Sequence, residues 1–194
     1  MKTYLVTGAA GFIGANYLKY ISTLHKDINI IVVDVLTYAG NLGTIEEELK
    51  DSRIKFEKVD IRDREGIERI FIENNVDYVV NFAAESHVDR SIENPQIFLE
   101  TNILGTQNLL ENAKKAWTVG KDENGYPIYR EGVKYLQVST DEVYGSLSKD
   151  YEIAKDLIIE DEEVKRVVSN RTNLKTYGEK FFTEETPLDP RSPY

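Results

Sequence analysis

Gly8-Ala9-Ala10-Gly11-Phe12-Ile13-Gly14 is the stretch that decides the fold of this chain. A short apolar run ending at Thr7 precedes it, and apolar residues at helical spacing follow it as far as Leu24. Glycines between a strand and a helix permit a tight turn and a close approach of the backbone to a phosphate, which the positive helix N-terminus favours. The spacing is G-x-x-G-x-x-G, so the turn alone fits a purely structural role equally well.

A second predicted strand and an acidic residue follow at the distance typical of a dinucleotide-binding fold. Residues 29–33 are mostly branched and apolar, and Asp34 stands at their end, twenty residues after Gly14. A carboxylate there accepts hydrogen bonds from the ribose of an adenosine and repels a 2′-phosphate. A solvated strand-end carboxylate is the alternative for Asp34 alone, but the order strand, glycine turn, helix, strand favours NAD as cofactor over NADP.

Composition excludes several classes of function. The 194-residue chain has a net charge of −10 and no basic stripe, which argues against nucleic acid or an anionic membrane as a partner. The chain has no cysteine, and its two histidines, His25 and His87, form no spaced cluster with carboxylates, so no metal site is predicted. No apolar run reaches the ~18 residues of a membrane span, and a strand follows Met1 directly, so we expect a cytoplasmic protein.

Strands and helices alternate along the first 138 residues. Such alternation predicts an α/β fold with a doubly wound parallel sheet, Rossmann-like, in the strand order 3-2-1-4-5. Further strands are expected at 54–59, 76–84 and 134–138, and helices at 44–50 (capped by Thr44, with Glu47 as capping-box partner), 64–74 and 94–117 (Asn94 as cap, Pro95 in the first turn). Residues 118–132 are expected to form a loop or a hairpin.

The sequence divides into three segments. We expect residues 1–145 to form the NAD-binding domain, residues 146–186 a charged insertion or lid with a helix around 153–168, and residues 187–194 the start of a further segment. The wide apolar stripe of the predicted helix at 94–117 suits packing on the sheet, and it equally suits a subunit interface in a homodimer.

Two adjacent carboxylates, Asp141 and Glu142, follow the predicted strand at 134–138, with Thr140 beside them. A solvated loop is the ordinary explanation of such a pair. At the carboxyl end of a strand in this fold, however, one carboxyl can stay protonated as a general acid while the other acts as an ionised general base. The Thr140 hydroxyl could then hydrogen-bond a substrate oxygen.

These stretches together resemble the extended short-chain dehydrogenase/reductases, and more narrowly the dTDP-glucose 4,6-dehydratases within them. The resemblance covers the chain from end to end. It rests on V-T-G-A-A-G-F-I-G (6–14), V-D-V-L-T-Y-A-G-N (33–41), F-A-A-E-S-H-V-D-R-S (82–91), T-N-I-L-G-T (101–106), S-T-D-E-V-Y-G (139–145) and S-P-Y (192–194).

The resemblance implies a lyase that removes water from the sugar of dTDP-glucose through an internal hydride cycle of NAD. In that cycle Tyr194 would deprotonate the C4 hydroxyl, Glu142 would remove the C5 proton and Asp141 would protonate the leaving C6 hydroxyl. Thr140 and Ser86 would contact the sugar. The residues implied to line the cofactor are Gly8, Gly11, Phe12, Ile13, Gly14, Asp34, Val35, Leu36, Thr37, Asp60, Ile61, Ala83, Ala84, Glu85, Thr101 and Tyr194.

The chain departs from the family pattern in two respects. The family tyrosine belongs to a Tyr-x-x-x-Lys pair, and this sequence ends at Tyr194. We therefore expect a fragment of a longer chain that lacks the substrate domain and is inactive by itself. Residues 146–186 also make the interval between the carboxylate pair and Tyr194 longer than the family pattern suggests.

Three alternatives remain open. A UDP-hexose 4-epimerase needs the tyrosine and NAD but no acid and base for elimination, so Asp141 and Glu142 disfavour it. A GDP-mannose 4,6-dehydratase would be expected to use NADP, which Asp34 disfavours. A non-catalytic NAD-binding module would not need Asp141, Glu142 and Tyr194 together.

Overall fold

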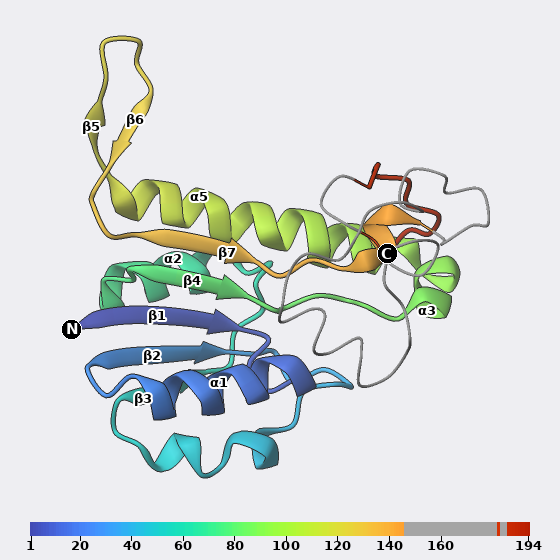
Figure 1. The fold of residues 1–194 in the computed structure, drawn as a ribbon, viewed down its shortest axis with the longest axis horizontal. Coiled ribbons are helices and arrows are strands. Elements are labelled where there is room, and N and C mark those ends of the chain that lie inside the picture. The colour runs from blue at the N-terminus through green and yellow to red at the C-terminus, as the bar shows by residue number, and fades with distance from the viewer. Residues whose placement is uncertain (146–181, 183–185) are drawn as a thin grey trace, which may run out of the picture. The chain divides into compact units, whose positions relative to one another are not determined.

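A five-stranded parallel sheet forms the centre of the computed structural model, which describes residues 1–145, 182 and 186–194 (Figure 1). Its strand order is β3-β2-β1-β4-β7. Every neighbouring pair is parallel, which confirms the predicted doubly wound sheet, with β7 as the fifth strand. The strands are β1 (Lys2–Thr7), β2 (Ile28–Val33), β3 (Ile54–Glu57), β4 (Tyr78–Asn81) and β7 (Lys134–Gln137).

Helices cover both faces of this sheet because alternate strand residues point to opposite sides. Leu5 of β1 packs with the helices α2 (Arg64–Asn74) and α5 (Thr106–Trp117), whereas its neighbour Val6 packs with α1 (Phe12–Leu24). Both residues are fully buried. The two apolar clusters hold the carboxyl ends of β1, β2 and β4 together at one edge of the sheet.

Two of the strands are shorter than the sequence predicted, the edge strand β3 and the inner strand β4. The strand expected at 76–84 is paired only over β4, and the one expected at 54–59 ends with β3 at Glu57. The assigned strands end at these residues, although the Phe82 N–H, one residue beyond β4, still donates to the Thr7 carbonyl at 3.1 Å. Strand β4 therefore ends at Asn81, and Ala83 lies in the turn region next to the glycine turn.

The region predicted as one helix at 44–50 is instead two 3₁₀ turns, η1 (Leu42–Ile45) and η2 (Glu48–Lys50). Thr44 is not the cap, which corrects that expectation. The Asn41 side chain accepts the N–H of Gly43 at 2.9 Å and so begins the turn earlier, while the Thr44 hydroxyl donates to the Asn41 carbonyl at 2.6 Å. Asparagine commonly initiates such turns through its own side chain.

The predicted helix at 94–117 is interrupted. It consists of α4 (Pro95–Phe98), the π-helical segment η3 (Leu99–Gly105) and α5, and a short helix α3 (Val88–Glu93) that was not predicted precedes it. Pro95 occupies the first turn as expected, but the Asn94 side chain makes no capping hydrogen bond. π-helical turns are rare and recur at functional sites.

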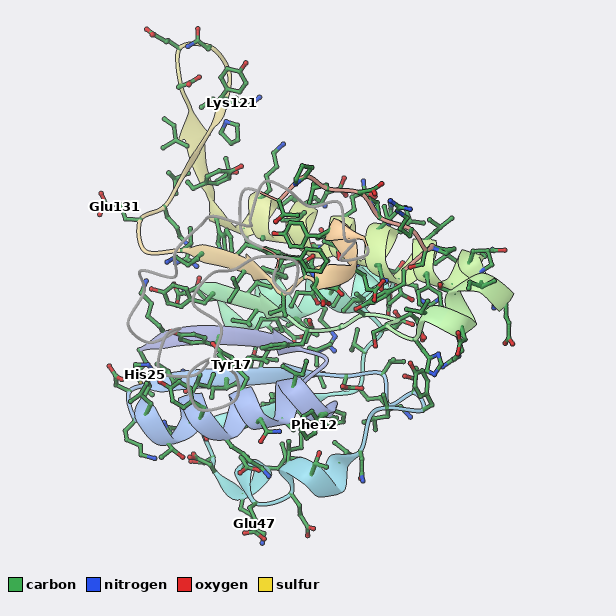
Figure 2. All side chains as sticks on the ribbon, turned by 45° about the vertical axis from the view of Figure 1, so that its right-hand side comes forward. Phe12, Tyr17, His25, Glu47, Lys121 and Glu131 are labelled. Atoms are coloured by element: carbon green, nitrogen blue, oxygen red, sulfur yellow. The ribbon has the colours of Figure 1, made fainter. Side chains whose placement is uncertain are left out.

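Residues 118–129 form the hairpin that the sequence allowed for this region, with β5 (Thr118–Lys121) antiparallel to β6 (Pro127–Tyr129). Figure 1 shows it extending away from the sheet, and Figure 2 labels Lys121, the last residue of β5, and Glu131, which follows β6. No helix in the described part of the chain is long and apolar enough to cross a membrane.

The chain divides into two compact units, residues 1–138 together with Tyr194, and residues 139–193. In the second unit, η4 (Asp141–Tyr144) is a 3₁₀ turn. The insertion predicted at 146–186 and its helix at 153–168 lie outside the described residues, apart from Phe182 and Thr186.

Candidate functional site

The glycine turn after β1 adopts a conformation that side chains would prevent. Gly8 has a φ of +65°, and a Cβ atom there would lie 2.6 Å from the nitrogen of Ala83. A Cβ on Gly14 would lie 2.3 Å from the Gly8 carbonyl oxygen. Both glycines are therefore required by the packing of β1, α1 and the segment after β4.

Gly11 differs from these two glycines. A Cβ atom there would approach only the Gly8 carbonyl oxygen, at 3.3 Å, a tight contact that a shift of a few tenths of an ångström would relieve, so the fold restricts this position less than Gly8 or Gly14. Gly11 is the N-cap of α1, and no side chain caps that helix. The next two residues, Phe12 and Ile13, are 85% and 62% exposed, and Phe12 lies at the N-terminal end of α1 in Figure 2. The open helix N-terminus suits an anionic group such as a phosphate.

Asp34 lies at the end of β2 and is almost completely buried. Its carboxylate accepts the N–H of Ala10 at 3.0 Å and the N–H of Leu36 at 2.8 Å. A carboxylate has about four lone-pair positions, so two acceptor positions remain after these bonds. Asp34 thus ties the glycine turn to the next loop and retains capacity for ligand hydroxyls.

The loop after Asp34 folds back on itself. Leu36 has a φ of +60°, Val35 is 37% exposed, and Thr37 is exposed and accepts the N–H of Gly40 at 3.2 Å. The N–H of Asn41 donates to the Ala10 carbonyl at 3.0 Å. Both ends of this loop are therefore fastened to Ala10 of the glycine turn.

Asp60 and Ile61, which were expected to line the cofactor, come after β3 in the chain. The Asp60 carboxylate forms a bidentate ion pair with Arg62, at 2.6 Å for the shortest contact. Burial would raise the pKa of Asp60, but its hydrogen bonds to Arg62 prevail and lower it, so the group stays ionised. The Ile61 side chain lies in the core.

Asp60 also lines a surface hollow of about 540 Å³, together with Arg62, Asp63, Arg64, Glu100, Leu104 and Asn108.

The segment after β4 carries Ala83, Ala84, Glu85 and Ser86. Asn102 in η3 holds it in place: the side chain accepts the N–H of Glu85 at 2.9 Å and donates to the Glu85 carbonyl at 2.8 Å. Glu85 is buried, whereas Ala84 and Ser86 are exposed. Thr101, which was also predicted to line the cofactor, precedes Asn102 in η3 and is half-buried.

Asn81 was not identified from the sequence and organises the carboxyl ends of three strands. Its side-chain oxygen accepts hydrogen bonds from the Thr7 hydroxyl and the Ala83 N–H, and its nitrogen donates to Gln137 at 2.8 Å. Burial raises the pKa of the neighbouring Tyr135 to about 12, so its hydroxyl stays protonated. A polar residue at the end of an apolar run was the only sequence signal for Asn81.

The predicted catalytic turn in the second unit is well defined locally. Thr140 caps η4, and its hydroxyl accepts the N–H of Glu142 at 3.2 Å. Asp141 is exposed and Glu142 is half-buried. A Cβ on Gly145, where φ is +79°, would lie 2.3 Å from the Asp189 carbonyl oxygen, and the Asp189 N–H donates to Val143 at 3.0 Å. The two carboxylates therefore belong to the start of one hydrogen-bonded turn.

Tyr194 groups with the first unit, where its ring centroid lies 6.2 Å from that of Phe98 in α4. Phe98 is buried, so it offers a fixed surface to the tyrosine ring. The assignment of Tyr194 as a catalytic base stays a prediction.

The first unit fits a dinucleotide. Gly11 stands at a helix N-terminus that no side chain caps, Asp34 keeps free acceptor positions, and one carboxylate oxygen of Glu85 is buried without a hydrogen-bond donor among the described residues. Such an oxygen is costly unless a ligand donor pairs with it. These three features surround the carboxyl end of β1, where ligands bind in doubly wound sheets.

Comparisons with known proteins agree with this geometry. The family model described as GDP-mannose 4,6 dehydratase matches residues 5–157. A dTDP-glucose 4,6-dehydratase of Escherichia coli is 41% identical over 191 residues, covering 98% of this chain and 45% of the relative. This chain thus spans about 45% of the length of the curated relatives that it matches.

Solved structures give the same result. The dTDP-glucose 4,6-dehydratase of Bacillus anthracis, solved in complex with NAD, is 36% identical in sequence and superposes with a TM-score of 0.68. The match covers 100% of this chain and 46% of the Bacillus anthracis chain. The UDP-glucose 4-epimerase of Thermus thermophilus, also solved with NAD, is 26% identical with a TM-score of 0.67, covering 99% and 46%. The fold expected from the sequence is therefore confirmed.

Proposed function

We propose a function from one premise: the chain belongs to the GDP-mannose 4,6 dehydratase family. The full-length protein dehydrates dTDP-glucose to dTDP-4-keto-6-deoxyglucose and keeps NAD bound during the reaction. The relatives named dTDP-glucose 4,6-dehydratase support this substrate. Asp34, which would repel the 2′-phosphate of NADP, supports NAD.

The Thr140-Asp141-Glu142 turn is the observation that carries the proposal. Elimination of water needs one group that removes a proton and another that delivers one, and the two carboxylates begin the same capped turn. Asp141 is exposed and Glu142 half-buried, so the two carboxyls occupy different environments.

Three residues carry the proton transfers in the proposed reaction. Tyr194 accepts the proton of the C4 hydroxyl, Glu142 removes the proton at C5, and Asp141 protonates the C6 hydroxyl, which leaves as water. NAD, when bound, supplies the hydride acceptor for C4 and the hydride donor for C6. Thr140 and Ser86 contact the sugar, and the glycine turn, Asp34 and the segment 83–85 hold the cofactor.

The test uses the full-length protein with dTDP-glucose and no added NAD. We expect a 4-keto-6-deoxy sugar, detected by mass and by its absorbance in alkali. Glu142→Gln should abolish exchange of the C5 proton with deuterium from solvent, because the base is gone. Asp141→Asn should lower product formation more than that exchange. The predicted inactivity of residues 1–194 is tested by the same assay.

A UDP-hexose 4-epimerase is the second candidate, because the Thermus thermophilus structure has the same fold at 26% identity. Interconversion of UDP-glucose and UDP-galactose, without loss of water, would establish that function instead. An NAD-binding module would bind the cofactor and convert none of these sugars.

We propose that the full-length protein assembles as a homodimer. The helical segment from α4 to α5 exposes Leu99, Ile103, Leu104 and Leu110 at 50%, 58%, 53% and 46% of their surfaces. A run of exposed apolar side chains on one helical segment suits a subunit interface. Sedimentation of the full-length protein tests it, with Ile103→Glu expected to give monomers. The cytoplasmic location stays a prediction.

A further inference from the structure

Arg90 joins two loops that lie far apart in the sequence. The carbon at the centre of its guanidinium lies 4.1 Å from the centroid of the Tyr38 ring, within the range of a cation–π interaction. One of its nitrogens lies 3.7 Å from a carboxylate oxygen of Glu85. Tyr38 belongs to the loop after β2, whereas Glu85 and Arg90 belong to the segment after β4.

The topology of the sheet determines what this connection crosses. Strands β2 and β4 flank β1, and all three run parallel. A contact between the segments that follow β2 and β4 therefore spans the carboxyl end of β1. The residues that leave β1 there are those of the glycine turn, Gly8 to Gly14.

The connection is anchored at both sides. The loop that carries Tyr38 is fastened to Ala10 by the Asp34 carboxylate and by the N–H of Asn41. On the other side, the Asn102 side chain holds both backbone polar groups of Glu85. The joint between Tyr38 and Arg90 is exposed by comparison, with 59% of Tyr38 accessible to solvent. It is therefore the part that can open without unfolding the rest.

Glu85 links this connection to a ligand. Its oxygen Oε2 is buried and has no hydrogen-bond donor in the described part of the chain, and the 3.7 Å distance to Arg90 is too long for a hydrogen bond. Arg90 compensates the charge of the carboxylate but leaves that oxygen free. A ligand hydroxyl or amide would complete its bonding.

We propose that Tyr38, Arg90 and Glu85 form a strap across the glycine turn that slows release of the bound dinucleotide. The inference rests on the proposed function, because a cofactor that is reduced and reoxidised within one turnover must not leave between the two steps. Arg90 and Tyr38 act in it as positioning residues: they hold the two loops together, and Glu85 contacts the ligand.

The experiment measures release of NADH from the full-length protein. The protein is loaded with NADH and mixed with excess NAD, and the loss of bound NADH fluorescence gives the dissociation rate. We expect Tyr38→Leu and Arg90→Met each to release NADH about two- to fivefold faster, the range of an exposed cation–π contact. The double variant should release it no faster than the quicker single variant, because both changes break the same joint.

Two controls separate the strap from general destabilisation. Tyr38→Phe keeps the aromatic ring and should release NADH at the wild-type rate. Tyr126→Leu removes a tyrosine of similar exposure (69%) from the turn of the β5–β6 hairpin and should change nothing. Tyr38 lies on the surface, so its variant remains informative even if Arg90→Met does not fold.

The outcomes are distinguishable. If wild-type protein binds no NADH, the proposed cofactor is wrong and the strap fails with it. If the wild type binds NADH but Tyr38→Leu and Arg90→Met release it at the wild-type rate, the strap alone is overturned. Faster release that also occurs in Tyr38→Phe would equally contradict it, since the ring rather than the hydroxyl makes the contact.

Discussion

The carboxylate of Asp34 accepts the backbone N–H of Ala10 at 3.0 Å, and this bond ties the end of β2 to the glycine turn after β1. The same carboxylate accepts the N–H of Leu36 at 2.8 Å. One residue therefore shapes two of the loops at the proposed cofactor site and carries the charge expected to distinguish NAD from NADP.

Asp34→Asn should affect stability and cofactor choice together. One carboxylate oxygen becomes an amide NH₂, so either Ala10 or Leu36 loses its acceptor, at a cost of about 1–2 kcal/mol in the free energy of unfolding. Loss of the charge should weaken NAD binding by about tenfold or more and narrow the preference over NADP. Urea denaturation of the full-length variant measures the loss of stability, and titration with NAD and with NADP measures the two affinities. An unchanged preference for NAD over NADP would contradict the role of Asp34.

Gly11→Ala should separate binding from folding. The new Cβ would meet only the Gly8 carbonyl oxygen at 3.3 Å, so the free energy of unfolding should change by less than about 1 kcal/mol. Binding of NAD should weaken strongly, because the methyl group occupies space open to a phosphate.

Gly14→Ala is the matched control for that variant. Its Cβ would lie 2.3 Å from the Gly8 carbonyl oxygen and 2.8 Å from the Cα of Ala9, so the backbone must shift. We expect a loss of about 2 kcal/mol or more in stability. If Gly11→Ala and Gly14→Ala unfolded at the same temperature, the close packing of Gly14 against Gly8 and Ala9 would not limit stability.

Local signals were sufficient to predict the sheet and the glycine turn. The spacing from Gly14 to Asp34 and the apolar runs around them follow from residues near in sequence, and the general rules for parallel sheets supply the strand order. The position of Asp141 and Glu142 directly after the last strand was predictable for the same reason, although their roles stay predictions.

Contacts between distant segments were not predictable in this way. Asn102 lies within the predicted helix at 94–117, but in the structure it belongs to the π-helical segment η3 and bonds Glu85, seventeen residues earlier. Asn81 binds side chains from two neighbouring strands, and Arg90 meets Tyr38 only because β2 and β4 flank β1. No periodicity in the sequence encodes these pairings.

Asn81→Ala should destabilise the whole first unit. The side chain is fully buried, and its removal leaves the Thr7 hydroxyl, the Ala83 N–H and the Gln137 side chain without their partner. Unsatisfied buried groups and the cavity together should cost about 2–4 kcal/mol. Gln137→Ala removes one of these bonds from an exposed position and should cost less than about 1 kcal/mol in the same urea unfolding experiment. Equal losses would contradict a central role for Asn81.

Asp77 should make stability depend on acid pH. This carboxylate lies just before β4, is buried, and accepts hydrogen bonds from the Thr3 N–H at 2.9 Å, from Arg130 at 2.5 Å and from Lys2 at 3.3 Å. Burial alone would raise its pKa, but these bonds and the charge of Arg130 prevail and lower the pKa of Asp77 below its ordinary value of 3.8.

The sign of the pH effect follows from that lowered pKa. A carboxyl group that ionises more readily in the folded chain contributes stability that is fully present above pH 3.8 and is lost as the pH falls through the folded value. Asp77→Asn should therefore lower the free energy of unfolding by about 3 kcal/mol at pH 7, because Arg130 keeps a partly buried, unpaired charge. The difference from wild type should shrink below about pH 4, because the unfolded wild-type chain then binds a proton that the folded carboxylate, with its lowered pKa, does not.

Arg130→Met provides the complementary variant. It removes the cation and leaves Asp77 with the Thr3 N–H and Lys2, so the carboxylate should become easier to protonate and its contribution should disappear at a higher pH than in wild type. Urea unfolding of the three proteins from pH 7 to pH 3 compares these curves. A gap between wild type and Asp77→Asn that stayed constant over this range would mean that Asp77 acts through its shape and hydrogen bonds, and that its charge contributes nothing.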